Sequence, residues 1–204
     1  MRRLALLPLL ALAAMLAAAP ARAQQFVFDD ISGSRTQTTG LTIGNDLYAS
    51  FTNTAGPAQF SQVTLHLGNR GSGTNGVITV GLYSQSTTTG LVGSILGTIG
   101  TINDSNLSTS YGAITLSTTS TFLLAAGTRY FIGLIDSGTS GAWMQTSTTT
   151  GVTGEYHNTN NTGVGALNNT VAYMMQVAVP EPASMALFGT AIAGMLAARR
   201  RRRG

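Results

Sequence analysis

The 204-residue chain contains no cysteine and no lysine, and charged residues make up only 9% of it. Without cysteine there are no disulfides, no thiolate metal ligands and no cysteine nucleophile. Without lysine every positive side chain is an arginine, so the placement of the arginines decides where positive charge can act. These absences leave a chain rich in serine, threonine, glycine and alanine, whose chemistry must come from hydroxyls, amides and a few carboxylates.

The formal charge of +4 and the pI near 10.0 point at first to nucleic acid, but the charges are unevenly placed. Most arginines lie at the two ends, and between Gln24 and Val179 three arginines face six acids, a net charge of −3. A weakly acidic domain without a basic patch has no electrostatic reason to bind phosphate backbones. We therefore expect no nucleic-acid partner. The residues of this middle segment are Arg35, Arg70 and Arg129 against Asp29, Asp30, Asp46, Asp104, Asp136 and Glu155.

The N-terminus has the organisation of a secretion signal. Arg2 and Arg3 precede an apolar run from Leu4 to Ala19, and Ala21-Arg22-Ala23 forms an A-x-A cleavage site. This order predicts a signal peptide over residues 1–23 that forms a helix and is removed after Ala23. The secretory translocon and signal peptidase are then expected partners. The alternative, a transmembrane anchor or buried helix, does not account for the small-residue site.

The C-terminus, residues 180–204, combines a short motif, an apolar helix and a basic cluster. Pro180, Glu181 and Pro182 precede 16 residues, Ala183 to Ala198, in which only Ser184 and Thr190 are polar. The stretch is somewhat shorter than the roughly 20 residues of a comfortable span, but it predicts a transmembrane helix. The basic cluster fixes its orientation, because positive flanks stay cytoplasmic. Its members are Arg199, Arg200, Arg201, Arg202 and Arg203.

This C-terminal order resembles the PEP-CTERM sorting signal, and it is carried by Val179-Pro180-Glu181-Pro182-Ala183-Ser184, the apolar helix and the arginines. The resemblance implies that an exosortase, a membrane-embedded cysteine protease of Gram-negative bacteria, recognises Pro180, Glu181 and Pro182 and removes the helix. It implies a protein that is held transiently in the inner membrane and then reaches the cell surface or extracellular matrix. A plain single-span tail anchor is the alternative.

Residues 24–179 alternate with period two. Val63, Leu65 and Leu67 share one face of a strand, as do Tyr130, Ile132 and Leu134, and glycine-rich clusters separate such runs. Strict alternation predicts half-buried strands, and several short strands with turns between them predict an all-β, antiparallel sandwich of jelly-roll type. The glycine-rich segment from Gly68 to Gly76 is expected to be a hairpin loop.

The same middle segment resembles the choice-of-anchor R domains of bacterial surface proteins. The resemblance covers roughly Asp46 to Thr150 and includes an opening strand over Asp46–Phe51 with Phe60–Leu67 as its partner. It implies a surface domain combined with an interchangeable anchor, and it implies no activity.

Catalytic and metal sites are not indicated by the sequence. His66, one of two histidines, alternates with apolar residues and is expected to face solvent on its strand. Glu155 with His157, or Asp29 with Asp30, offers a start to a metal site, but two residues do not complete one. No cofactor, no metal and no catalytic residue are therefore predicted, and the chain is expected not to be an enzyme.

A carbohydrate-binding role is the main alternative for the middle domain. Trp143, Tyr156 and Tyr173 are candidate stacking platforms, with amide side chains such as Asn158 nearby in sequence. The leading hypothesis is a non-enzymatic surface or matrix protein, processed by an exosortase and associated with exopolysaccharide or biofilm. The alternative is a carbohydrate-binding or glycan-acting module on a jelly-roll scaffold.

Overall fold

The computed structural model describes residues 24–31, 35–41, 43, 46–54, 56–146, 155, 157–159 and 172–180. These residues form strands with one short 3-10 helix, η1 (Asp104–Asn106), as the alternating pattern predicts. The strands are β1 (Gln24–Asp29), β2 (Arg35–Gly40), β3 (Leu47–Thr52), β4 (Ala58–Gln59), β5 (Gln62–Asn69), β6 (Val77–Gln85), β7 (Val92–Asn103), β8 (Gly112–Ser117), β9 (Leu123–Leu124), β10 (Arg129–Asp136), β11 (Gly141–Thr146), β12 (His157–Thr159) and β13 (Met175–Pro180).

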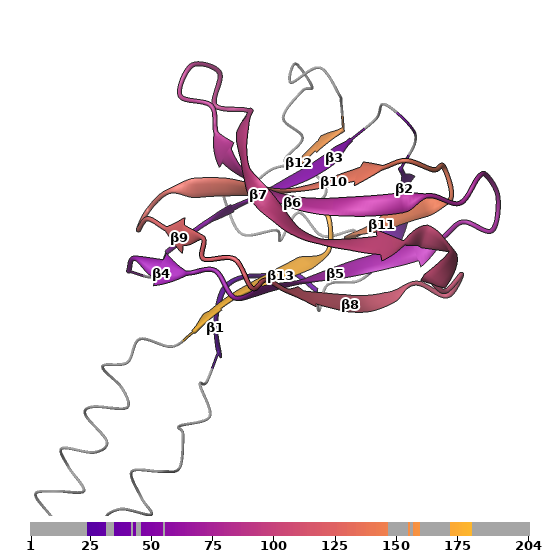
Figure 1. Ribbon diagram of the computed structural model, residues 1–204, viewed down its shortest axis with the longest axis horizontal. Coiled ribbons are helices and arrows are strands. Elements are labelled where there is room, and N and C mark those ends of the chain that lie inside the picture. The colour runs from indigo at the N-terminus through magenta and orange to yellow at the C-terminus, as the bar shows by residue number, and fades with distance from the viewer. Residues whose placement is uncertain are drawn as a thin grey trace, which may run out of the picture. The chain divides into compact units, whose positions relative to one another are not determined.

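Two main sheets make up the domain (Figure 1). One has the order β12-β3-β10-β6-β7, and the other has the order β1-β13-β5-β11-β2, with β8 also paired to β5. Pairings such as β10 with β6 and β5 with β8 are antiparallel, in agreement with the sequence-based expectation. β4 and β9 form a separate two-stranded sheet, from which Leu124 reaches the common core.

Strand β5 is the hub of the larger sheet. β8 pairs with it from Gln62 to Leu67 along one edge. On the other edge β13 pairs with the first half and β11 with the second half, and a bridge joins Gln145 of β11 to Tyr173, two residues before β13. Neighbours on both edges satisfy the backbone hydrogen bonds of β5, and the strand is buried from Val63 to Gly68.

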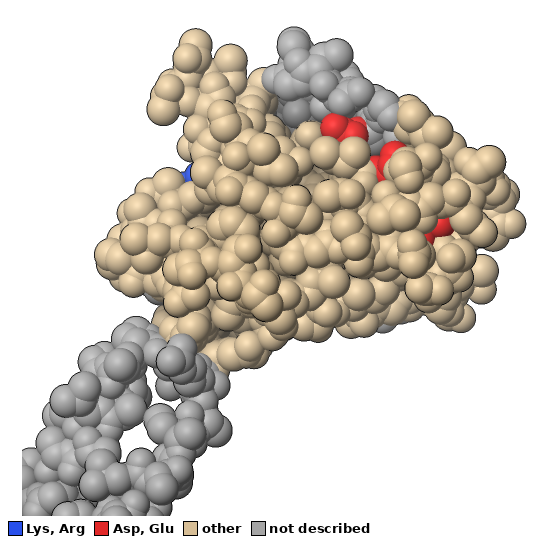
Figure 2. Space-filling view, in the orientation of Figure 1, with Lys and Arg blue, Asp and Glu red and all other residues tan. Residues whose placement is uncertain are grey.

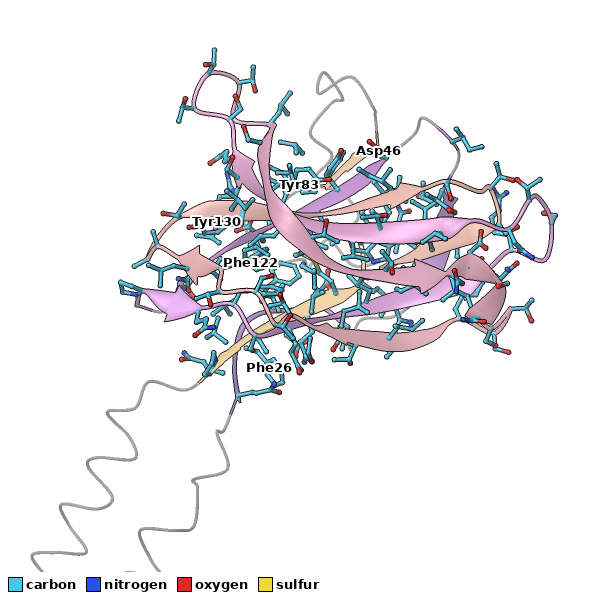
Figure 3. The ribbon with its side chains drawn as sticks, in the orientation of Figure 1. Phe26, Asp46, Tyr83, Phe122 and Tyr130 are labelled. Atoms are coloured by element: carbon cyan, nitrogen blue, oxygen red, sulfur yellow. The ribbon has the colours of Figure 1, made fainter. Side chains whose placement is uncertain are left out.

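One hydrophobic core lies between the sheets and receives side chains from both. Val63, Leu65 and Leu67 of β5 are at most 1% exposed, and the inward residues of β6 and β10 are at most 6% exposed. The predicted inner faces are therefore confirmed. The inward residues on β6 are Ile78, Val80 and Leu82, and on β10 they include Ile132 and Leu134. Phe122 and Tyr130 lie between the layers at the end near β9 (Figure 3).

Several connections cross between the sheets, and two sequence-based predictions about which strands are neighbours are wrong. β5 and β6 belong to different sheets, so the segment from Gly68 to Gly76 spans the sandwich and is not a hairpin loop. The strand over Asp46–Phe51 does not pair with Phe60–Leu67; β3 pairs instead with β10 and β12. Alternation reports which residues face inward, but it carries no information about which strands are neighbours.

Within the described residues no helix is long and apolar enough to span a membrane. The predicted signal helix and the predicted transmembrane helix lie outside these residues. The described domain forms a compact unit from Gln25 to Pro180.

Candidate functional site

The end of β13 is the point at which the β domain meets the proposed sorting segment. Val177, Ala178 and Val179 are at most 1% exposed, and Val177 pairs with Val63 of β5. The Ala178 carbonyl accepts hydrogen bonds from the Ser61 amide at 3.1 Å and from the Ser61 hydroxyl at 2.8 Å. Pro180 is the last strand residue, and because it lacks an N–H it cannot extend the ladder as a donor. The Pro-Glu-Pro motif thus follows the last buried strand without a linker.

β1 lies next to β13, so the beginning and the end of the described domain are neighbours in one sheet (Figure 1). Asp30 makes two hydrogen bonds to Met175 of β13. Its Oδ1 accepts a hydrogen bond from the Met175 amide at 2.6 Å, and its own amide donates to the Met175 carbonyl at 3.1 Å. Asp29 accepts from Gln176 Nε2 at 2.9 Å. These two aspartates, a potential calcium pair in the sequence, connect β1 to β13.

Asp30 is only 7% exposed, and burial raises its pKa to about 7, against the opposing effect of the Met175 amide. The neighbouring Asp29 carboxylate raises the pKa of Asp30 further. The junction therefore contains a carboxyl group that changes its charge near neutral pH.

The outer face of the five-stranded sheet carries a polar cluster around Glu155. Its carboxylate forms an ion pair with Arg129 Nε at 3.1 Å and accepts hydrogen bonds from the hydroxyls of Ser50 and Thr52. Arg129 is on β10, and Ser50 and Thr52 are the outward residues of β3. Glu155 is thus committed to this cluster, so it does not present a free carboxylate to a metal with His157, whose side chain lies outside the description.

Two tyrosines cross the same outer face. Tyr48 and Tyr83 meet edge to face with ring centroids 5.3 Å apart, and the Tyr48 hydroxyl donates to Asp46 Oδ2 at 3.1 Å. Both rings lie against Gly133, where a Cβ would come within 2.6 Å of either ring. Asp46 and Tyr83 lie on the side of the sheet that faces away from the second sheet (Figure 3). Burial, followed by the Asp46 carboxylate, raises the pKa of both tyrosines, so their hydroxyls stay protonated.

The surface has very few charges. Figure 2 shows a face composed almost wholly of uncharged side chains, with small acidic areas near its upper and right edges. The strands β7 and β8 expose mainly threonine, serine and single aliphatic residues such as Ile95 and Leu96. Such a surface interacts through hydroxyl hydrogen bonds and apolar contact and makes little use of electrostatic attraction.

Two of the aromatic residues proposed for glycan stacking belong to the core. Trp143 and Tyr173 are 0% exposed and stack on one another with centroids 4.6 Å apart and an interplanar angle of 13°. Trp143 Nε1 donates to the Met174 carbonyl at 3.0 Å. The proposal of these residues as platforms is therefore wrong, because they point inward from β11 and the start of the β13 segment. Tyr156 lies outside the described residues.

His66 was expected to face solvent, but it is only 5% exposed. Its amide donates to the Met174 carbonyl at 3.1 Å, and β5 has strands on both edges. The prediction is wrong because alternation distinguishes the two faces of a strand but not whether neighbouring side chains cover the outer one. The sequence also provided no indication of the Arg129–Glu155 ion pair, because its two members are far apart in the chain.

The terminal site residues, apart from Pro180, lie outside the described residues. They are Ala21, Ala23, Glu181, Pro182, Arg199, Arg200, Arg201, Arg202 and Arg203. The described part of the chain contains no group of three or more His, Cys, Asp or Glu side chains that could hold a metal ion.

Comparison with known families identifies the C-terminal segment. Residues 178–202 match the PEP-CTERM protein-sorting motif, so the match begins at Ala178 and Val179 inside β13. This motif is that of an exported protein with a membrane-anchored C-terminal sorting signal, handled by an exosortase. No curated protein is significantly similar to the chain.

Proposed function

We propose that this protein is a non-enzymatic component of the cell surface or extracellular matrix of a Gram-negative bacterium, associated with exopolysaccharide or biofilm. In this scheme the translocon exports the chain and signal peptidase removes residues 1–23. The C-terminal helix holds the chain transiently in the inner membrane until an exosortase acts at Pro180, Glu181 and Pro182. The observation that carries the proposal is the sorting-motif match over residues 178–202.

The β domain supports a structural role in two ways. Three of the domain's six carboxylates make contacts within the domain: Glu155 with Arg129, Asp46 with Tyr48, and Asp30 with the Met175 amide. The weakly charged, hydroxyl-rich surface suits contact with neutral polysaccharide, because hydroxyls can exchange hydrogen bonds with sugars. The jelly-roll topology and membership of the choice-of-anchor R domains are parts of the same proposal, and the domain's all-β architecture is compatible with both.

The sorting step is tested by changing Pro180-Glu181-Pro182 to three alanines in the full-length chain, expressed in a host with its exosortase. We expect the wild-type chain in a shortened form outside the inner membrane and the variant as full-length chain in the inner-membrane fraction. Immunoblotting of the fractions provides the measurement. Unchanged processing of the variant would show that the motif is not the recognition element.

Because Pro180 is part of β13, a folding defect must be distinguished from a recognition defect. Glu181→Ala changes the motif outside the described strand and is the second variant. Changing Thr87-Thr88-Thr89 to alanines, in the exposed loop between β6 and β7, is the matched control and should be processed like wild type.

A carbohydrate-binding or glycan-acting module is the second candidate. The observation in its favour is the row of exposed threonine and serine side chains on β7 and β8, because hydroxyls can exchange hydrogen bonds with sugars. Tyr48 and Tyr83 are at most 9% exposed, so they do not provide a stacking platform. Purified protein on a glycan array and a hydrolase panel separates the candidates. Reproducible turnover would contradict the structural proposal, and binding without turnover would favour the lectin-like role.

A further inference from the structure

Two aspartates outside the sites described so far are buried at one end of the domain. Asp104 of η1 is 0% exposed and Asp136, the last residue of β10, is 4% exposed. They lie where three connections between strands meet, namely β5 to β6, β7 to β8 and β10 to β11. This is the right-hand end of the domain in Figure 1.

Each carboxylate uses one oxygen to organise a loop. Asp104 Oδ1 accepts from the Gly76 amide at 2.7 Å, and the Asp104 amide donates to the Gly76 carbonyl at 3.1 Å. Asp136 Oδ1 accepts from the Gly138 amide at 2.9 Å. Both aspartates therefore have fixed positions before any ligand arrives.

The second oxygen of each carboxylate is buried without a hydrogen-bond partner. Asp104 Oδ2 lies 2.8 Å from the position that a Cβ on Gly138 would take, and the Thr74 carbonyl oxygen lies 2.5 Å from the same point. Asp136 Oδ2 lies beside Gly141, 2.9 Å from its corresponding Cβ position, without making a hydrogen bond of regular geometry. Asp104 Oδ2 and the Thr74 carbonyl thus lie against Gly138, whose amide also donates to Asp136 Oδ1, so both carboxylates flank the same turn.

No positive side chain compensates these carboxylates in the described part of the chain. Arg129 forms an ion pair with Glu155, and the exposed Arg70 directs its guanidinium toward Gly40. Burial raises the pKa of Asp136 above its usual range, the Gly138 amide opposes this rise, and the Asp104 carboxylate adds to it. A buried carboxylate without a counter-charge is unfavourable unless it is neutralised or coordinates a metal.

We propose that Asp104 and Asp136 form a calcium site that fastens the three connections at this end of the β domain. Calcium takes six to eight oxygen ligands, commonly carboxylates, backbone carbonyls and water. Here two carboxylates supply the charge, the Thr74 carbonyl is a further candidate ligand, and water completes the shell. With only two acids, the expected Kd is on the order of 0.1–1 mM, as in extracellular modules that meet millimolar calcium.

The test titrates CaCl2 into the purified full-length chain and follows thermal unfolding by the fluorescence of the single tryptophan, Trp143. At 10 mM calcium we expect the Tm to rise by roughly 3–6 °C, with MgCl2 at equal ionic strength giving at most a third of that rise. Equilibrium dialysis with radioactive calcium should give one site per chain.

Asp104→Asn and Asp136→Asn keep the side-chain shape and the amide contacts but remove one charge each. Each should lose most of the calcium-dependent rise in Tm and weaken binding at least tenfold. Asp30→Asn, which changes a buried aspartate that bonds β13 in the other sheet, is the matched control and should show the wild-type response to calcium. The proposal is overturned if wild-type chain binds no calcium in dialysis at 10 mM, if magnesium stabilises equally, or if both variants keep the full response.

Discussion

At the scale of single residues, Asp30 connects stability to pH. Its pKa is about 7 in the folded chain because the carboxyl is buried between β1 and β13, whereas its ordinary value is 3.8. Between these two values the folded chain holds a proton that the unfolded chain has released. Unfolding therefore releases a proton in this window, and the free energy of unfolding falls as the pH rises through it.

We predict that the wild-type chain loses roughly 2–4 kcal/mol of unfolding free energy between about pH 4 and pH 8 through Asp30, and that Asp30→Asn removes most of this loss. Asparagine retains the acceptor for the Met175 amide but has no charge to bury. Urea unfolding at a series of pH values, followed by Trp143 fluorescence, measures the slope. Asp29→Asn is the control and should keep most of it, and an unchanged slope in Asp30→Asn would contradict the assignment.

Trp143 has two possible roles in the sequence, a sugar platform or a core residue, and the structure shows that it is a core residue. A single tryptophan in a serine- and threonine-rich domain is compatible with a sugar platform, but here its ring stacks on Tyr173 and its N–H reaches the Met174 carbonyl. These contacts join β11 to the segment that leads into β13. The residue therefore stabilises the strand that ends at the sorting motif.

At the scale of elements, the connections between sheets depend on close backbone approach. A Cβ on Gly76 would lie 2.2 Å from the Gly138 amide nitrogen, and a Cβ on Gly138 would lie 2.5 Å from the Gly76 amide nitrogen. Only glycine at both positions lets the β5–β6 connection pass the β10–β11 connection at this distance. Asp104 contacts both connections, because its Oδ1 accepts a hydrogen bond from the Gly76 amide and its Oδ2 lies beside Gly138.

We predict that Gly76→Ala lowers the free energy of unfolding by about 1–3 kcal/mol, because backbone atoms must shift to admit the methyl group. Gly112→Ala on β8 is the matched control, since nothing lies within 4 Å of the position of its Cβ. The control should change stability by no more than about 0.5 kcal/mol. Urea unfolding of the three proteins is the measurement, and equal stabilities of Gly76→Ala and wild type would contradict the close approach.

At the scale of the whole molecule, charge is divided between the domain and its ends. The full chain has a pI near 10.0, yet residues 24–179 contain three arginines and six acids. The positive charge therefore belongs to segments that the proposed processing removes. A nearly neutral, slightly acidic domain is what reaches the exterior in this scheme.

We predict that the processed protein focuses at an acidic pI, several units below that of the full-length chain. Two-dimensional gels of the inner-membrane and extracellular fractions measure this directly. A variant with Arg35 and Arg70 changed to glutamine should shift the processed form further toward acid. It should still be processed, because both residues lie outside the sorting motif. A basic extracellular form would mean that the arginine cluster remains attached.

The sequence alone determined the terminal signals and the strand faces. Both are local properties: a sorting motif is a linear order of Pro180, Glu181, Pro182, an apolar run and arginines, and alternation along β5 or β10 follows from the pleat of a single strand. The motif match over residues 178–202 confirmed the C-terminal sorting signal, and burial of residues such as Leu65 and Ile132 confirmed the strand faces. The signal peptide over residues 1–23 stays a prediction.

Only the tertiary structure decided which strands are neighbours and which polar groups meet. β3 pairs with β10 rather than with β5, His66 is buried, Glu155 pairs with Arg129, and Asp104 and Asp136 both lie against Gly138. These strand pairings and side-chain contacts join residues that are distant in the chain. They depend on how the two sheets pack and on which connections cross between them. No local pattern encodes such a contact, because its energy arises only when the whole core closes.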